Sequence, residues 1–196
     1  CRYVHTKENG SMSQSYDLVV IGGGPGGYEA AIRAAQLGMK VACIEKRVHK
    51  GKPSLGGTCL NVGCIPSKAL LHAAKVISEA KAASKHGIDF GKPNIDLDQL
   101  RTWKESVINK LTKGLSALAK QRKVQVVQGI GRFLNPHALE VATPDGKKIV
   151  TFDHCIIAAG STATRIPGFP DDPRLMDSTD ALALTAIPKR DRKSVA

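Results

Sequence analysis

The chain has 196 residues, 42% of them hydrophobic, which is long enough to bury the core of one ordinary domain. No apolar run approaches the roughly 20 residues of a membrane span, and no charged-then-apolar leader indicates export. The formal net charge is +12, yet basic residues are spread along the chain and only 4% of residues are aromatic. A solvated basic surface is therefore favoured over a platform that stacks nucleic-acid bases.

Five cysteines are an odd number, and the chain carries no export signal, so we do not expect structural disulfides. A pair that does form should be catalytic or redox-sensing. Cys43 and Cys155 each lie in an apolar run, and we expect both to be buried strand residues. The polar, patternless residues 1–11, which begin with cysteine, are interpreted as a tag or leader outside the fold.

The stretch that follows predicts a βαβ unit. Leu18–Ile21 is a continuous apolar run bounded by glycines, as in a buried parallel strand. Apolar residues then recur at helical spacing over residues 30–37, and Gly38 caps the helix. A second buried strand is predicted over residues 41–44, with Glu45 at its end.

The rest of the chain alternates helical and strand patterns. "VHKGKPSLGG" predicts a turn-rich loop, and helices are predicted over residues 69–84, broken at 86–87, and over 100–121. An Asx-type start in "DFGKPNIDLDQL" precedes the second helix. Four strands are predicted from "KVQVVQGIGRF", "ALEVAT", "GKKIVTF" and "DHCIIAAG", with a hairpin at "TPDGKK".

Gly22, Gly24 and Gly27 form a GxGxxG pattern between the first strand and the helix. These glycines allow a tight turn, a close approach of a pyrophosphate to the backbone, and packing of the helix on the strand. Glu45 lies eighteen residues beyond Gly27, where a carboxylate can accept ribose hydroxyls. The pattern predicts a dinucleotide site but does not separate NAD from FAD.

Cys59 and Cys64 are predicted to lie where a loop enters a helix. Their spacing places both sulfurs within reach of a disulfide if the turn is tightened, and a helix N-terminus favours the reactive thiolate. Lys68 follows one turn later on the same side and could polarise an electron acceptor. Gly57 and Thr58 offer an open backbone and a hydroxyl to phosphates or a ribityl chain.

"GGTCLNVGCIPSKALL" resembles the redox-active disulfide signature of the class I pyridine nucleotide-disulfide oxidoreductases. Over residues 16–188 the chain resembles the N-terminal part of the dihydrolipoyl dehydrogenases, especially in "RTWKESVINKLT", "VQGIGRF" and "DSTDALALTAIPK". The resemblance implies an α/β fold, a Rossmann-like FAD-binding domain with a parallel sheet, an antiparallel β-meander insertion and long helices. This domain is expected to be incomplete relative to the family.

The resemblance also implies roles for single residues. Cys59 would be the interchange thiol, Cys64 the thiolate nearer the flavin, and Lys68 would lie near the flavin as well. Glu45 would bind the adenosine ribose with Lys46 near it. The remaining contacts to FAD would come from backbone and small side chains, namely Gly22, Gly24, Gly26, Gly27, Gly57, Thr58, Ile130, Gly131, Ala159 and Gly160.

For the parent protein the resemblance implies oxidation of dihydrolipoamide on the acyltransferase component of 2-oxoacid dehydrogenase complexes. Electrons would pass through the cysteine pair and FAD to NAD, in a cytoplasmic homodimer of bacterial type. After "TAIPK" the sequence reads "RDRKSVA", where the family continues into an NAD domain. We therefore expect residues 12–188 to be the first segment of the FAD-binding domain and 189–196 an unmatched tail, and expect this chain alone to be inactive.

Two other interpretations of the sequence stay open, and a third is disfavoured. Another disulfide reductase, such as a glutathione or mercuric reductase, shares the disulfide signature. A non-catalytic FAD-binding module would retain flavin without reducing a disulfide. A zinc site at Cys59 and Cys64 is disfavoured because no second ligand pair has suitable spacing, and no metal is expected.

Overall fold

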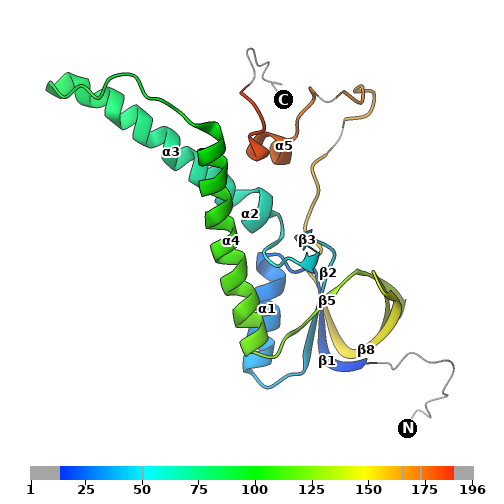
Figure 1. Cartoon of the computed structure of the whole chain (residues 1–196). Helices are drawn as coiled ribbons and strands as arrows, with labels where there is room; N and C mark the ends of the chain where they lie inside the picture. Colours follow the sequence, from blue (N-terminus) through cyan, green and yellow to red (C-terminus); the bar gives the residue numbers. More distant parts are fainter. Residues whose placement is uncertain (1–13, 50, 165, 173, 188–196) are drawn as a thin grey trace, which may run out of the picture. The chain divides into compact units, whose positions relative to one another are not determined.

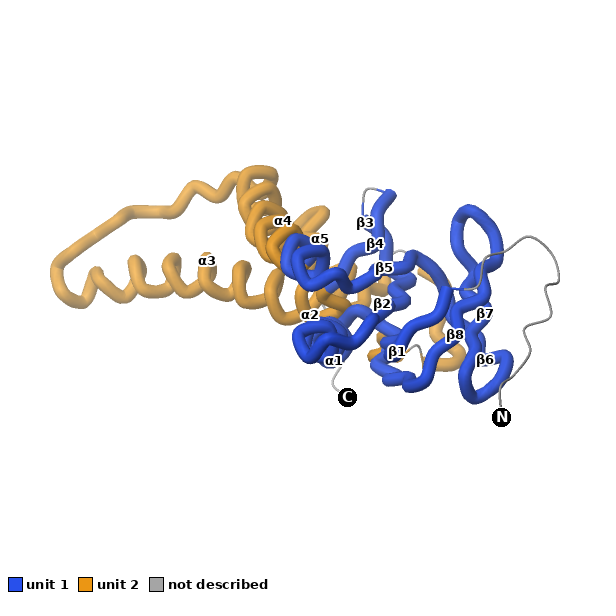
Figure 2. Tube along the Cα trace, turned by 90° about the horizontal axis from the view of Figure 1, so that it is seen from below, with its two compact units in different colours: residues 1–55, 116–159 blue, residues 56–115, 160–196 orange. Residues whose placement is uncertain are grey.

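The structure is a computed structural model, and it describes residues 14–49, 51–164, 166–172 and 174–187 (Figure 1). The chain divides into two compact units (Figure 2). Unit 1 comprises residues 1–55 and 116–159, and unit 2 comprises residues 56–115 and 160–196. The expected leader, 1–11, and the expected tail, 189–196, lie outside the described residues.

Unit 1 is built on a six-stranded sheet in the order β5-β2-β1-β8-β7-β6. Its strands are β1 (Gln14–Ile21), β2 (Val41–Glu45), β5 (Gln125–Gln128), β6 (Ile130–Asn135), β7 (Ala138–Thr143) and β8 (Gly146–Ile157). β5, β2, β1 and the second half of β8 run parallel, whereas β6, β7 and the first half of β8 form an antiparallel meander. The α/β fold with a parallel sheet and a meander insertion is confirmed.

Helix α1 (Pro25–Gln36) connects β1 to β2 and completes the predicted βαβ unit. It begins five residues earlier than the apolar spacing predicted, because Pro25 suits the first helical turn and Gly24 takes the N-cap position. The chain leaves the helix through Gly38, whose φ of 91° lies in the left-handed region. The C-cap residue itself is Leu37.

Two strand boundaries were predicted wrongly. "GKKIVTF" and "DHCIIAAG" are one strand, β8, because it pairs with β7 through its first half and with β1 through its second. "KVQVVQGIGRF" is two strands, β5 and β6, separated by Gly129 with a φ of 158°. The predicted hairpin at "TPDGKK" is confirmed, with Thr143 opposite Gly146. The loop "VHKGKPSLGG" also holds a small ribbon, β3 (Val48–His49) paired with β4 (Lys52–Pro53).

The core of unit 1 lies between the parallel strands and the antiparallel meander of the same sheet. It includes side chains from both parts of the sheet, with Val19, Ile44, Leu139 and Val141 all at 2% exposure or less. Tyr16 and Phe152 close the cluster at the β1–β8 pair. The loop that carries the first glycines is therefore attached to the best packed part of the molecule.

Unit 2 is helical. It contains α2 (Gly57–Val62), α3 (Cys64–Ala82), η1 (Ala83–His86), most of α4 (Leu97–Gln121) and α5 (Ser178–Ala183). The Asx-type start is confirmed, since the Gln99 amide donates to Asp96 Oδ1 at 3.0 Å. The helix expected from residue 69 instead begins at Cys64. No helix in the described parts of the chain combines the length and apolar character that a membrane crossing requires.

Candidate dinucleotide and disulfide site

The glycine turn of unit 1 leaves no room for side chains at two of its positions. A Cβ on Gly22 would overlap the Ala158 carbonyl oxygen, and Gly22 has a φ of 102°. A Cβ on Gly27 would overlap the Gly22 carbonyl oxygen. A Cβ on Gly26 meets nothing within 4 Å, so this position opens outward from the first turn of α1. The turn thus packs tightly on the sheet and leaves an open space at the helix N-terminus.

Glu45 is 5% exposed at the end of β2 and binds the turn directly. Its Oε2 accepts from the Gly23 amide at 2.8 Å, and its Oε1 accepts from the Arg47 amide at 2.7 Å. Carboxylate oxygens can each accept more than one hydrogen bond, so ribose hydroxyls can still be accepted. Glu45 therefore also has a structural role in the turn, which was not predicted.

These features fit a dinucleotide such as FAD. The first turn of α1 contains no acidic residue, and the first N–H groups of a helix have no partner within the helix. A diphosphate beside Gly26 would meet an unobstructed backbone, with Glu45 at the neighbouring strand end. The helix N–H groups can donate to the diphosphate, Glu45 can accept from a ribose hydroxyl, and the space at Gly26 is open.

Five other predicted cofactor contacts lie at strand ends, whereas Gly57 and Thr58 are the first two residues of α2. Lys46 is exposed directly after β2. Ile130 and Gly131 begin β6, immediately after the Gly129 turn, whose amide donates to the Glu45 carbonyl at 3.0 Å. Ala159 and Gly160 follow β8 and are exposed. Among these, the 129–131 turn is joined to the Glu45 strand by a hydrogen bond.

Two residues of unit 1 were missed by the sequence analysis. Gly23 is buried, donates to Glu45, and a Cβ there would come within 2.6 Å of Leu55 and 2.8 Å of Glu45 Oε2. Ala158 lies against the glycine turn, and its amide donates to the Ile21 carbonyl at 2.8 Å. The run "GGG" has a middle glycine that the GxGxxG pattern does not require, which was a visible signal for Gly23. The role of Ala158 depends on strand pairing that the sequence does not show.

Cys59 and Cys64 form a disulfide in unit 2, with their Cα atoms 4.6 Å apart. Cys59 lies inside the short helix α2, and Cys64 is the first residue of α3, so a helix break rather than a loop entry separates them. Cys59 is half-buried and Cys64 is exposed. Lys68, also exposed, lies one turn after Cys64 on α3 and so shares its face.

Glycines shape the chain around the disulfide. Gly56 and Gly57 have φ values of 105° and 57°, and a Cβ on Gly56 would overlap the Leu60 side chain. A Cβ on Gly63 would lie 2.9 Å from the Thr58 carbonyl oxygen, so a side chain at the break between α2 and α3 would force the chain beside Cys59 to shift. Gly56 and Gly63 were missed by the sequence analysis as site residues, although both stand in the signature itself.

The remaining described cysteines are not poised to react. Cys43 is buried in β2, and burial with the nearby charge of Glu45 raises the pKa of its thiol to about 12. Burial also raises the pKa of Cys155, which is only half-buried rather than buried as expected. Because the thiolate is the nucleophile, these two thiols stay protonated near neutral pH.

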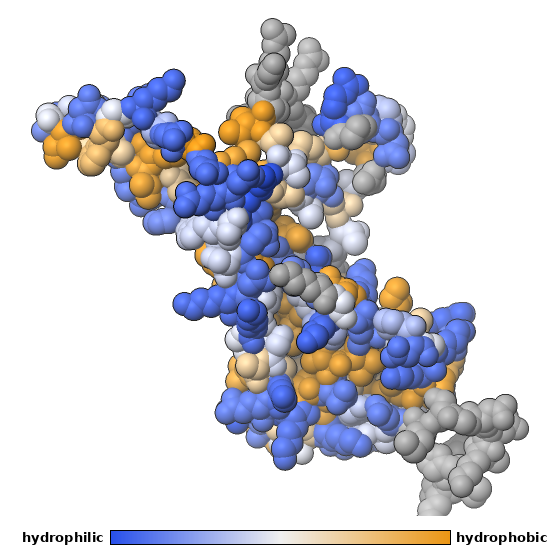
Figure 3. Space-filling view, viewed as in Figure 1, coloured by the Kyte–Doolittle hydropathy of each residue, from blue (hydrophilic) through white to orange (hydrophobic). Residues whose placement is uncertain are grey.

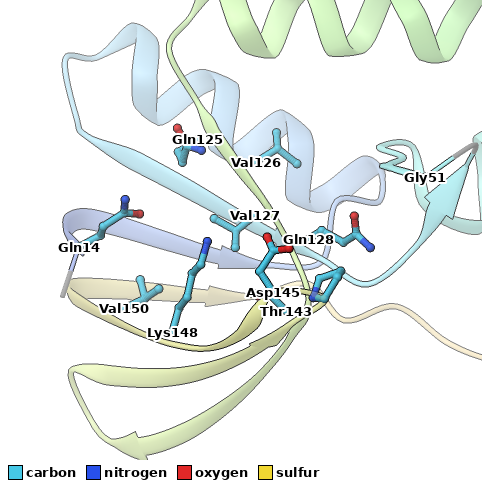
Figure 4. A pocket seen from close by; sticks show the side chains of 11 residues that line it. Gln14, Gly51, Gln125, Val126, Val127, Gln128, Thr143, Asp145, Lys148 and Val150 are labelled. Atoms are coloured by element: carbon cyan, nitrogen blue, oxygen red, sulfur yellow. The ribbon is translucent and has the colours of Figure 1, made fainter. Parts of the chain in front are cut away.

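No cluster of three or more His, Cys, Asp or Glu side chains that could hold a metal is present among the described residues. A separate cavity of about 530 Å³ lies beside β5 and the β7–β8 turn (Figure 4). Gln125, Gln128, Asp145 and Lys148 are among its lining residues, and none of the predicted site residues is. The cavity is thus distinct from both the glycine turn and the disulfide.

Comparison with known proteins agrees with this geometry. The family described as "Pyridine nucleotide-disulphide oxidoreductase" matches residues 16–196. A Vibrio cholerae protein named "Dihydrolipoyl dehydrogenase" is 56% identical over 172 residues, which is 87% of this chain and 35% of that protein. The Haemophilus influenzae protein of the same name is 53% identical over 175 residues, covering 88% and 36% of the two chains.

A Vigna unguiculata protein named "Leghemoglobin reductase" is 49% identical over 183 residues, covering 92% of this chain and 34% of that protein. The chain thus spans about a third of the length of the curated relatives it matches. Two of these relatives share more than half of the aligned residues with it. The chain therefore belongs to the pyridine nucleotide-disulphide oxidoreductase family.

Proposed function

We propose that this chain is the part of a dihydrolipoyl dehydrogenase that binds FAD and carries the redox-active disulfide. The Cys59–Cys64 disulfide at the break between α2 and α3 is the observation that carries the proposal. The two cysteines are five positions apart in the chain, and Cys64 is exposed to solvent. Four relatives at 50% identity or more bear the name dihydrolipoyl dehydrogenase, which supports lipoamide as the substrate of the whole protein.

The chemistry proposed for the cysteines is a thiol–disulfide exchange. A dihydrolipoamide thiolate attacks the sulfur of Cys59, the Cys59–Cys64 bond breaks, and Cys64 leaves as a thiolate. The second lipoamide thiolate then attacks the mixed disulfide, which releases oxidised lipoamide and leaves both cysteines reduced. Two electrons move from substrate to the cysteine pair, and the protons of the two substrate thiols go to solvent or to the cysteines.

FAD, when bound, supplies the two-electron acceptor for the reduced pair, and NAD is the final acceptor in the whole protein. We propose that Gly22, Gly24, Gly26 and Gly27 hold its diphosphate and Glu45 its ribose, with Cys64 as the sulfur that passes on electrons. Lys68 is placed by α3 on the face of Cys64, where its ammonium can stabilise negative charge. The remaining predicted contacts are Lys46, Gly57, Thr58, Ile130, Gly131, Ala159 and Gly160.

The partner proposed for the whole protein is the acyltransferase component of a 2-oxoacid dehydrogenase complex, which carries dihydrolipoamide. A homodimer and a cytoplasmic location are proposed on the same resemblance. Neither a nucleic-acid partner nor a membrane span is part of the proposal. Glutathione or mercuric ion as substrate remains the alternative within the family.

The test uses the 196-residue chain. Incubated with FAD and passed through gel filtration, it should retain flavin absorbance, and Glu45→Gln should retain less because one acceptor oxygen is lost. One equivalent of dihydrolipoamide, added without oxygen, should release two further protein thiols per chain. The double variant Cys59→Ser, Cys64→Ser should bind flavin and release none.

Absence of flavin from the wild-type chain, or new thiols from the double variant, would contradict the proposal. Oxidised lipoamide and oxidised glutathione are then compared as acceptors for the reduced chain. Faster reoxidation by glutathione would favour the alternative reductase.

A further inference from the structure

The short helix α5 is held at its N-terminus by its own side chains. Asp177 accepts from the amides of Thr179 at 2.7 Å and Asp180 at 3.1 Å, and Asp180 accepts from the Asp177 amide at 3.0 Å. This reciprocal capping box satisfies the first free donors of the helix. A helix of six residues is nevertheless too short to persist without tertiary contacts.

Its C-terminus is held by two cations from α4. Lys104 Nζ donates to the Leu182 carbonyl at 2.6 Å. Arg101 Nη1 donates to the carbonyls of Thr185 at 3.0 Å and Leu184 at 3.3 Å. The last carbonyls of a helix lack partners and carry partial negative charge, so cations bind them favourably. Leu184 itself has a φ of 55°, a conformation that a non-glycine residue rarely adopts without such support.

Lys104 makes the stronger of the two attachments because it is only 3% exposed. Its ammonium also pairs with Glu105 at 3.2 Å, whose side chain is 48% exposed. If α5 moved away, Lys104 would lose a charge-assisted hydrogen bond to the Leu182 carbonyl, which is roughly twice as strong as a neutral one. α4 and α5 are therefore held together by a contact that resists local opening.

α5 in turn approaches α2, with Cα atoms of the two helices within 8 Å. α2 has six residues, none of them fully buried, between the break at Gly63 and the turn at Gly56. α2 also lies against α3, to which the Cys59–Cys64 disulfide joins it, so once that bond is reduced α5 is a second neighbour that can hold the helix of Cys59. We infer that Lys104 is a positioning residue for the disulfide helix α2, acting through the carbonyl end of α5.

This inference rests on the proposed redox role of Cys59 and Cys64, but its test is separate. Cys59 is half-buried and Cys64 exposed, so loss of the α5 attachment should expose the first more than the second. The reduced chain is treated briefly with iodoacetamide, and each cysteine is quantified by peptide mass spectrometry. Lys104→Met should raise the Cys59:Cys64 labelling ratio about tenfold. This is the size expected if loss of one charged hydrogen bond makes local opening of α5 and α2 easier.

Cys43 serves as an internal control because it is 1% exposed in the separate sheet of unit 1. Its labelling should not change in Lys104→Met. Lys110→Met removes the same charge from an exposed position on α4 and should leave the Cys59:Cys64 ratio within about twofold of wild type. Lys104→Arg keeps a cation and should bring the ratio back toward the wild-type value.

An unchanged ratio in Lys104→Met would overturn the inference, as would equal increases at Cys59 and Cys43, which would indicate general unfolding. A ratio in Lys104→Arg as high as in Lys104→Met would overturn the role of the cation. Failure of the proposed function appears elsewhere, as absence of dihydrolipoamide-dependent thiols in the oxidised wild-type chain. The two failures are therefore distinguishable.

Discussion

The two units differ in how their functional residues are held. In unit 1 the glycine turn and Glu45 adjoin a sheet whose central side chains are almost fully buried, such as Val19 and Ile44. In unit 2 the nineteen-residue helix α3 buries only Pro66 and Ala69 and leaves Leu71 67% and Val76 51% exposed.

Apolar side chains are correspondingly visible at the surface along α3 in Figure 3. A dinucleotide cradle needs a backbone that does not move, which dense packing provides. The disulfide helices are instead held by a few specific constraints: glycine breaks, the sulfur–sulfur bond and the attachment of α5. Substitutions that disturb packing should therefore lower the stability of unit 1 most. Loss of a single contact should lower the stability of unit 2 most.

Two native probes can follow the units separately. Protection of Cys43 from alkylation reports on unit 1, because its side chain is buried in β2. Emission from Trp103, the single tryptophan, reports on unit 2, because it lies in the part of α4 that belongs there. The predictions below use these probes, in order of decreasing effect.

Gly27→Ala should have the largest effect. The new Cβ overlaps the Gly22 carbonyl oxygen, so either the turn or the start of α1 must shift. We expect a loss of about 3 kcal/mol in the free energy of unfolding of unit 1, with loss of flavin binding. Cys43 protection should fall sharply. The control Gly26→Ala adds its Cβ in open space within a helix and should not lower stability; equal losses in the two variants would refute this reading of the turn.

Reduction of the Cys59–Cys64 disulfide should destabilise unit 2 by about 2 kcal/mol, the loop-closure value for such a short loop. The Trp103 transition in urea should move to lower concentration, whereas Cys43 protection should hold. The double variant Cys59→Ser, Cys64→Ser supplies the control, because reductant should not change its transition. A reductant-dependent fall in Cys43 protection would show that the units are not independent in stability.

Alkaline pH should weaken unit 1 through Cys43. Its pKa is raised by burial from 9.0 to about 12. The unfolded chain therefore loses this proton first, and stability falls as pH rises from about 9 toward 12. Between pH 8 and pH 10 the wild-type chain should lose about 1 kcal/mol more of its free energy of unfolding than Cys43→Ala. Urea unfolding followed by circular dichroism at both pH values measures the difference, and equal losses would count against burial as the cause.

Lys75→Met should have the smallest effect. Lys75 pairs with Glu79 at 3.5 Å one turn along α3, but both side chains are mostly exposed. Such pairs contribute at most about 0.5 kcal/mol and are screened by salt. The Trp103 transition should shift slightly at low salt and not at 1 M salt. A shift as large as that caused by disulfide reduction would mean that α3 depends on surface charge.

Much of unit 1 could be predicted because its signals are local. The apolar run of β1, the helical spacing of α1 and the glycines between them lie within one short stretch, and all three elements formed as expected. The boundaries of β5, β6 and β8 could not be predicted. They depend on which distant strand each segment pairs with, and β8 changes partner along its length.

The sulfur pair shows the same division. Its spacing and its glycines predicted a redox disulfide, because the constraint acts within six residues. The position of Cys59 inside a helix was not predicted. The contact of Lys104 with the end of α5 was not predictable either, because Lys104 and Leu182 are 78 positions apart in the chain. A buried lysine has no local signature that distinguishes it from the exposed lysines around it.

The amino-acid sequence by itself determined the glycine turn, the cysteine couple and the βαβ unit, because each depends on neighbouring residues and on the steric freedom of glycine. Only the tertiary structure decided that Ala158 packs against the glycine turn and that the Gly23 amide donates to Glu45. It also decided that α4 binds the C-terminal carbonyls of α5. These contacts join segments far apart in the chain, and their energies arise from packing and desolvation that exist only after the chain has folded.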